Sequence, residues 1–280
     1  MLAIGAMLTA GCARETRVLR FWIASDPPPV QAAPGEIATY EEAVHTIARI
    51  MVRELDMPLS GPLTVFVYPT REAYADGLVD TGRLAPEQAA KIAAYSVAVT
   101  EHGRLFINDE DMRDLPRSAW LAMIAHELTH HAQYQLSGGR RGRSEQWLRE
   151  GMADWVACQV LDRLGRTTLR REREHALREI AAAWPEIASE PLDLVELGRP
   201  SGWEARHFGP DGHLVYRLAF LLTDDLILQH RWPRLLDYFR AFTESEERFD
   251  EFRRAFGESL ERFGADALAR LRNDLVRRGG

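Results

Sequence analysis

Cysteine is scarce in this chain, and its scarcity excludes a fold held together by disulfides. The 280 residues contain only Cys12 and Cys158. One follows an apolar N-terminal run and the other lies in a helical pattern, so we expect no bond between them. For Cys158 we expect a small buried side chain on a helix, because no neighbouring group would activate its thiol.

Excess positive charge and long hydrophobic runs are lacking as well. The formal net charge of −7 argues against nucleic acid as a partner, since that binding requires a concentrated basic face. The apolar stretch 214–228 is interrupted by Arg217, Asp224 and Asp225, so it predicts a core helix rather than a membrane span. With 46% apolar residues, the chain can bury a substantial core.

The N-terminus carries a short apolar run, Leu2 to Ala10, which is followed by Gly11-Cys12. The run is too short to span a bilayer, and it resembles a bacterial lipoprotein signal peptide. The resemblance implies a signal segment over 1–12, a lipid on Cys12, and a protein of the bacterial cell envelope, anchored to a membrane or else secreted or periplasmic. The proline-rich residues 13–35 predict a tether.

Residues 36–165 predict a lobe with a small mixed sheet and several helices. Apolar spacing predicts a helix over 36–55, and β-branched and aromatic residues between two prolines predict a strand over 63–68. Another helix is expected over 71–79. The stretches 95–100 and 104–107 flank Glu101-His102-Gly103 and predict a hairpin, either strand of which could be the edge that receives a peptide.

From residue 117 onward strand signals vanish and helical spacing dominates. Apolar residues from Leu121 to Leu136 predict a long helix, and Ser144 is expected to cap an antiparallel neighbour that ends near Gly165. Residues 166–280 predict a helical lobe, in which 185–212 form a long irregular stretch with one short helix over 192–197. The chain is therefore expected to have an α+β fold.

The most informative pattern is His126-Glu127-Leu128-Thr129-His130, with Glu150 in the following helix. Histidines four apart lie on the same face of a helix, so both rings can reach one metal ion, with Glu127 beside a water on that ion. Glu150 follows 24 positions after His126 and completes a ligand set for one catalytic Zn²⁺ per chain.

These residues resemble those of the gluzincins, the thermolysin-like zinc metallopeptidases, and of the small bacterial peptidase-MA-like families. The resemblance implies that His126, His130 and Glu150 bind the metal. It also implies that Glu127 is the catalytic base and that Asp154, one turn after Glu150, orients a ligand histidine.

Two related groups match less well. Metzincins would have a third histidine at position 136 and a glycine at position 133, where this chain has Leu136 and Gln133. Aminopeptidase-type gluzincins carry a Gly-x-Met-Glu-Asn-like segment upstream of the motif, and none is present in this sequence.

The ligand set predicts hydrolysis without a covalent intermediate. A water acidified by the metal would lose its proton to Glu127, which then protonates the leaving nitrogen. In gluzincins a Tyr or His of the C-terminal lobe typically helps to stabilise the oxyanion. Tyr216 is the first candidate for this role, His213 the second, and His207 a more remote third. The alternative for Tyr216 is a core tyrosine with a satisfied hydroxyl.

The chain is thus expected to be a zinc-dependent peptidase, an endopeptidase, acting on a peptide or protein substrate. The alternative is a non-catalytic binding or assembly lipoprotein with a structural or vestigial zinc site, because the sequence does not show whether the cleft is open. A chance motif in a helical scaffold would bind no metal at all.

Overall fold

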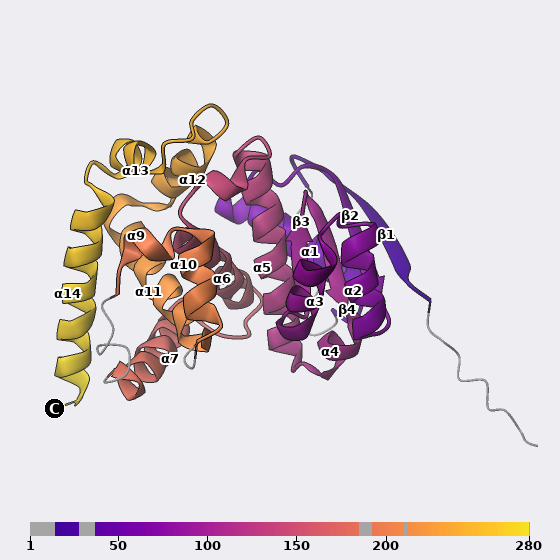
Figure 1. The fold of residues 1–280 in the computed structure, drawn as a ribbon, viewed down its shortest axis with the longest axis horizontal. Helices are drawn as coiled ribbons and strands as arrows, with labels where there is room; N and C mark the ends of the chain where they lie inside the picture. Colours follow the sequence, from indigo (N-terminus) through magenta and orange to yellow (C-terminus); the bar gives the residue numbers. More distant parts are fainter. Residues whose placement is uncertain (1–14, 28–36, 185–191, 210–211, 280) are drawn as a thin grey trace, which may run out of the picture.

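A computed structural model describes residues 15–27, 37–184, 192–209 and 212–279. The fold is α+β, as the sequence predicts: one half is a small mixed sheet with helices, and the other half is helical (Figure 1). The strands are β1 (Arg17–Ile23), β2 (Gly61–Tyr68), β3 (Ala98–Glu101) and β4 (Arg104–Asn108). The helices are α1 (Tyr40–Leu55), α2 (Arg71–Asp80), α3 (Pro86–Tyr95), α4 (Asp109–Asp114), α5 (Arg117–Leu136), η1 (Arg141–Arg143), α6 (Gln146–Arg163), α7 (Leu169–Ala182), α9 (Leu194–Leu197), α10 (Pro200–His207), α11 (Gly212–His230), α12 (Trp232–Ala241), α13 (Arg248–Phe256) and α14 (Leu260–Gly279).

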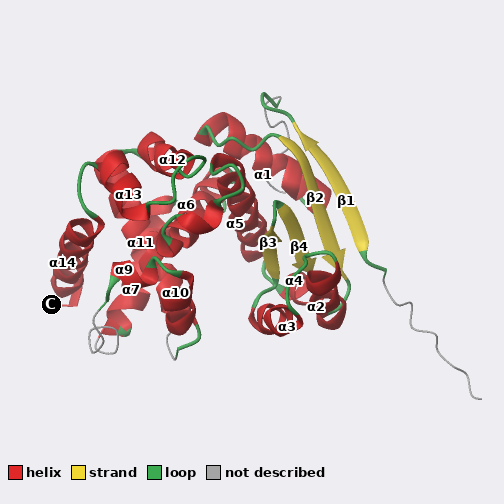
Figure 2. Ribbon diagram, turned by 45° about the horizontal axis from the view of Figure 1, so that its top comes forward, coloured by secondary structure: helices red, strands yellow, loops and turns green. Residues whose placement is uncertain are grey.

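The four strands form one sheet in the order β1-β2-β4-β3 (Figure 2). β2 runs parallel to β4, whereas β1 and β3 run antiparallel to their neighbours. The prediction of a tether over 13–35 is wrong for Arg17–Ile23, which form β1, because Phe21 and Ile23 alternate with exposed residues and bury one face of the strand in the core. The predicted signal segment, Cys12 and residues 28–35 of the predicted tether lie outside the described residues.

The β3–β4 hairpin is confirmed, with its turn at His102 and Gly103. Both residues have positive φ angles, 49° and 71°, as a two-residue turn requires to match the twist of the strands. The predicted first strand begins too early, because Tyr95 is the last residue of α3 and β3 starts at Ala98. The α3 helix starts at a proline, which the first helical turn accommodates.

Helices pack on both faces of the sheet. One face belongs to the main core with α1 and α5, through alternate residues such as Val65 and Leu105. The other face packs on α2 and α3, where Phe106 and Tyr68 lie in a smaller apolar cluster with Tyr74. The helix α5 contacts β3 and β4 on the sheet side and α6 on the helical side, so it joins the two halves of the molecule (Figure 1).

In the helical half, α6 lies between α5 and α11. The apolar residues of the two halves form one continuous core that extends from Phe21 to Leu275. The core helix predicted over 214–228 is confirmed, because most of its apolar side chains on α11 are buried. Among the described residues, no helix has the length and hydropathy needed to cross a membrane.

Two local predictions in the helical half are wrong. Ser144 is not the N-cap of α6; Glu145 holds that position, and its side chain makes no capping hydrogen bond. The stretch predicted as irregular contains a second helix, α10, in addition to α9. α10 begins at Pro200, and a proline there costs little, because the first N–H groups of a helix have no intrahelical partner.

Candidate metal centre

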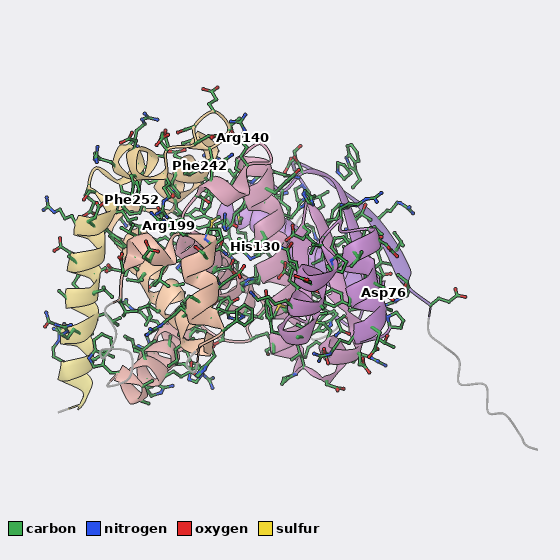
Figure 3. The ribbon with its side chains drawn as sticks, viewed as in Figure 1. Asp76, His130, Arg140, Arg199, Phe242 and Phe252 are labelled. Atoms are coloured by element: carbon green, nitrogen blue, oxygen red, sulfur yellow. The ribbon has the colours of Figure 1, made fainter. Side chains whose placement is uncertain are left out.

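The two motif histidines lie one turn apart on α5, at the junction of the two halves of the molecule, where Figure 3 labels His130. Their Nε2 atoms are 3.1 Å apart. The Oε2 atom of Glu150, on α6, lies 3.4 Å from each of them. Three potential ligand atoms from two helices therefore converge on one point, and the group could hold a metal ion.

The hydrogen bonds on the far side of each ring determine which nitrogen faces this point. The Nδ1–H group of His126 donates to Oδ1 of Asp154 at 2.8 Å, and that of His130 donates to Oε1 of Gln133 at 3.0 Å. In the neutral form of each ring, the proton is then on Nδ1 and Nε2 carries a lone pair. Two nitrogen lone pairs and a carboxylate oxygen thus face one another, an arrangement that only a cation or a proton stabilises.

The contact of His130 with Gln133 was not anticipated from the sequence. The amide of Gln133 is fully buried, and its Nε2 donates to the backbone carbonyl of Arg149 at 2.9 Å. That bond fixes the orientation of the amide, so Oε1 faces the imidazole. A glutamine three residues after a histidine has no distinctive sequence signature, although the two share a helix face.

Glu150 is held with one oxygen toward the histidines. Its Oε1 accepts a hydrogen bond from Nε2 of Gln146 at 2.7 Å, which leaves Oε2 directed at the Nε2 atoms of the two histidines. Burial disfavours a charged carboxylate, but the adjacent His130 and His126 outweigh burial and hold the pKa of Glu150 well below its usual range. Burial likewise opposes protonation of His126, yet hydrogen bonds with Asp154 and Glu150 raise its pKa well above normal.

Glu127 lies beside this group with an unused oxygen. The side chain is 5% exposed, and its Oε2 has no hydrogen-bond partner among the described residues. Its backbone carbonyl accepts a hydrogen bond from Oγ1 of Thr100 at 2.9 Å, which ties α5 to the strand β3. A buried carboxylate oxygen without a donor costs free energy, which is typical of a functional group that awaits a partner.

A cleft of about 300 Å³ opens onto His126, His130 and Glu150, which are together called the metal group below. Its walls come from β3 and α3 in one half of the molecule and from α6, α10 and α11 in the other. Across the cleft, Nζ of Lys91 on α3 lies 2.6 Å from Oε2 of Glu204 on α10. The same Lys91 amine lies 4.3 Å from the ring centre of Phe208. Side chains of the two halves therefore meet over the cleft.

Aromatic side chains form the wall that faces the metal group. His207 contacts Tyr95 and Tyr216, with ring centres 4.8 and 5.4 Å apart, and Tyr216 packs edge-on against Trp203. All four line the cleft. Burial and the nearby carboxylate of Glu150 raise the pKa of the Tyr216 phenol far above its ordinary value of 10. Burial lowers the pKa of His207.

The structure distinguishes among the three candidates for the side chain that would stabilise an oxyanion. Tyr216 lines the cleft, as does His207, whose Nδ1 is buried and has no hydrogen-bond partner among the described residues. His213 is exposed on α11 and is not among the residues that line the cleft, so the structure does not bring it to the metal group. His213 lies on the first turn of α11, where its side chain is exposed to solvent.

Other polar residues of interest lie away from the cleft. His131, which follows His130 on α5, is 4% exposed, and its Nε2 lies 3.0 Å from the side-chain amide of Gln135. Cys158 is half-buried on α6, and burial raises the pKa of its thiol, as expected for an inert cysteine.

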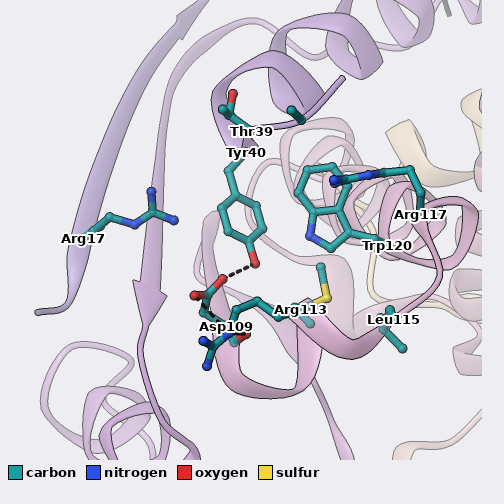
Figure 4. A pocket seen from close by; sticks show the side chains of 10 residues that line it. Arg17, Thr39, Tyr40, Asp109, Arg113, Leu115, Arg117 and Trp120 are labelled. Atoms are coloured by element: carbon teal, nitrogen blue, oxygen red, sulfur yellow. Dashed lines mark hydrogen bonds and ion pairs between the residues drawn. The ribbon is translucent and has the colours of Figure 1, made fainter. Parts of the chain in front are cut away.

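A second cavity, of about 450 Å³, lies beside β1, where the hydroxyl of Tyr40 donates a hydrogen bond to Asp109 (Figure 4).

Within the described ranges, His126, His130 and Glu150 form the only group of three His, Cys, Asp or Glu side chains whose potential ligand atoms converge. Comparison of the chain with protein-family models, with curated proteins and with solved structures finds no match. The function is therefore inferred from the chemistry of this group and its cleft.

Proposed function

We propose that the protein is a zinc-dependent peptidase of the gluzincin type, which hydrolyses peptide bonds. One observation carries the proposal: three ligand atoms converge at the base of a cleft, next to a buried Glu127 oxygen that has no partner among the described residues. Ligands alone would suit a structural metal site. A free carboxylate within the same cleft supplies the base that hydrolysis needs.

The spacing of the ligand atoms favours zinc. Zinc binds imidazole nitrogen and carboxylate oxygen at about 2.0–2.1 Å in a tetrahedron, which places ligand atoms about 3.3 Å from one another. The three separations here are 3.1, 3.4 and 3.4 Å. Calcium and magnesium prefer shells of oxygen ligands and suit two imidazoles poorly. Three protein ligands also leave a fourth position open, as catalytic zinc sites do.

Zinc bound there would act as a Lewis acid on a substrate carbonyl and would acidify a water. Glu127, which lines the cleft and whose backbone carbonyl is held by Thr100, would take a proton from the attacking water and pass it to the leaving nitrogen. The phenol of Tyr216 stays protonated because its pKa is raised, so it can donate to a developing oxyanion. Asp154 and Gln133 hold the two imidazoles in place.

The cleft suits an extended polypeptide. β3 is an outer strand of the described sheet, and all four of its residues line the cleft. A peptide backbone can pair with such an edge through main-chain hydrogen bonds, which recognise an extended chain more than a particular sequence. This supports a peptide or protein substrate. Lipidation of Cys12 and a place in the cell envelope stay predictions, because Cys12 lies outside the described residues.

The decisive experiment compares the unaltered chain with Glu127→Gln. The unaltered protein should contain about one zinc per chain and cut an unstructured polypeptide at internal bonds, as mass spectrometry of the products would show. Glu127→Gln should retain the zinc and lose cleavage. A matched control, Glu196→Gln, changes an exposed carboxylate outside the cleft and should leave both properties unaltered.

Two outcomes would contradict the proposal. Full activity of Glu127→Gln would remove Glu127 from the reaction. Stable zinc without turnover on a broad peptide library would instead favour the non-catalytic binding protein, in which the metal site is structural or vestigial.

A further inference from the structure

The strand β1 exposes large apolar side chains on one face. Trp22 is 76% exposed and Val18 is 41% exposed, and Arg20 stands between them on the same face. On the opposite face of the strand, Phe21 and Ile23 are buried in the core. Of the large apolar side chains in the described residues, Trp22 has the highest exposed fraction.

This face is uncovered because the helices stop short of it. On the outer side of the sheet, α2 and α3 pack over β2, β4 and β3, through the apolar cluster that contains Phe106. β1 lies beyond them at the outer edge of the sheet (Figure 2). Trp22 is therefore left opposite Pro62, and Val18 opposite Phe66, in a part of the sheet without a helix above it.

The sequence that leads into β1 and forms most of it has more basic than acidic residues, unlike the chain as a whole. From Cys12 to Trp22 the sequence has three arginines, at positions 14, 17 and 20, and one acid, Glu15, whereas the chain as a whole has a net charge of −7. Arg17 lies on the opposite face of the strand, and its Cζ atom is 5.6 Å from the ring centre of Tyr40 (Figure 4). Arg20 remains on the face with Trp22.

The position of β1 in the chain limits how far it can lie from a membrane anchor. Cys12 precedes the first residue of β1 by five positions. Even a fully extended chain of that length spans only about 17 Å. If Cys12 carries a lipid, β1 must therefore lie near the bilayer surface.

We propose that the face formed by Val18, Arg20 and Trp22, the β1 face, docks onto an anionic lipid bilayer. An indole is favoured at the boundary between headgroups and acyl chains, and a neighbouring arginine is attracted to anionic headgroups. Three side chains are too few for a stable dimer, which buries on the order of 1,200 Å² or more. They suffice for weak binding to a bilayer surface, which a lipid on Cys12 would strengthen.

Docking through the β1 face would place the contact at one edge of the described sheet and leave the cleft at the other edge. β1 and β3 are the two outer strands of the described sheet, and β3 lines the cleft. Three inter-strand steps, about 14 Å, separate them. The docking face itself does not depend on the proposed peptidase activity.

The test uses the full chain with Cys12→Ser, so that no lipid is attached, and vesicles of equimolar phosphatidylethanolamine and phosphatidylglycerol. Co-sedimentation should show that adding Trp22→Ser weakens binding roughly tenfold. Adding Arg20→Glu should weaken it roughly fivefold or more, and by much less on neutral phosphatidylcholine vesicles. Both side chains are exposed, so neither change disturbs the core.

Matched controls alter equally exposed residues elsewhere. Leu228→Ser removes an apolar side chain that is 56% exposed on α11, and Arg234→Glu reverses an exposed charge on α12; neither should change vesicle binding. Equal binding of the Cys12→Ser chain with and without Trp22→Ser, including no binding by either, would overturn the proposal. So would a dimer in light scattering that Trp22→Ser dissociates without any effect on vesicle binding.

Discussion

The Nδ1 atom of His126 lies 2.8 Å from Oδ1 of Asp154, so one helix, α6, contacts both nitrogens of the same ring. Glu150 faces Nε2 and Asp154 binds Nδ1. The carboxylate of Asp154 keeps the proton on Nδ1 and makes Nε2 a better ligand. The relationship explains why two acids one helical turn apart follow the motif in sequence.

Asp154→Asn should therefore weaken metal binding without removing a ligand. An amide can still accept the Nδ1–H bond but lacks the negative charge that increases the basicity of the ring. We expect zinc affinity to fall roughly 10- to 100-fold, as measured by competition with a chromogenic chelator. Asp114→Asn, at an exposed position on α4, is the control. Unaltered affinity would show that Asp154 does not support the metal site.

The candidate ligands could be predicted from sequence because their geometry is largely local. A four-residue spacing on one helix brings His126 and His130 together whatever the rest of the fold does. Glu150 was harder, since its position depends on how α6 packs against α5, and the resemblance to gluzincins supported its role. Gln133 was missed because its contact depends on the orientation of a buried amide.

Tyr216→Phe should test the second donor. The raised pKa of Tyr216 keeps its phenol protonated at neutral and alkaline pH, so the hydroxyl is available as a donor throughout. Its removal should lower kcat on the order of 10²-fold, by the same factor at pH 6 and pH 9, with zinc content and KM little altered. Tyr134→Phe, outside this cleft, is the control.

His207 provides the competing assignment. Its lowered pKa leaves the ring neutral at pH 7, with one nitrogen able to donate. A large loss of kcat in His207→Ala together with full activity of Tyr216→Phe would transfer the role to His207.

The wall of the cleft illustrates what sequence patterns do not contain. Tyr95 and His207 are more than a hundred positions apart, yet their rings are 4.8 Å from each other. The helix α10, which carries His207, lies in a stretch rich in prolines and glycines that predicts a loop. Its formation depends on tertiary burial of Trp203, which local propensity does not report.

Gly151→Ala should show how closely α6, the helix that carries Glu150, packs against α11. A Cβ on Gly151 would lie 2.2 Å from both the carbonyl oxygen of Ala219 and Oγ1 of Thr223, so α6 and α11 would have to move apart. We expect the free energy of unfolding to fall by about 1–3 kcal/mol, measured by denaturant titration. The control Ala265→Gly, at an exposed position inside α14, measures the effect of helix propensity alone. Unaltered stability of Gly151→Ala would mean that the two helices can separate at little cost.

Glu145 should make stability depend on pH. Its side chain is fully buried at the N-cap of α6, with Oε2 3.0 Å from Nη1 of Arg248. Burial raises the pKa of Glu145 from 4.5 to about 7, although Arg248 and Arg149 oppose the shift. Between these two pH values the folded state binds more protons than the unfolded state, so the contribution of Glu145 to stability falls as pH rises. Below pH 4.5 the carboxyl is protonated in both states and the slope disappears.

Glu145→Gln should remove this part of the pH dependence. A neutral amide has no proton to lose, so the variant should lose less stability than the unaltered chain between pH 5 and pH 8, by on the order of 3 kcal/mol. The difference between the two chains isolates Glu145, because every other titrating group contributes to both. Denaturant unfolding at each pH measures it, with Glu247→Gln as the exposed control. Parallel pH profiles for Glu145→Gln and the unaltered chain would mean that the Glu145 carboxyl is ionised throughout, stabilised by Arg248 more strongly than burial destabilises it.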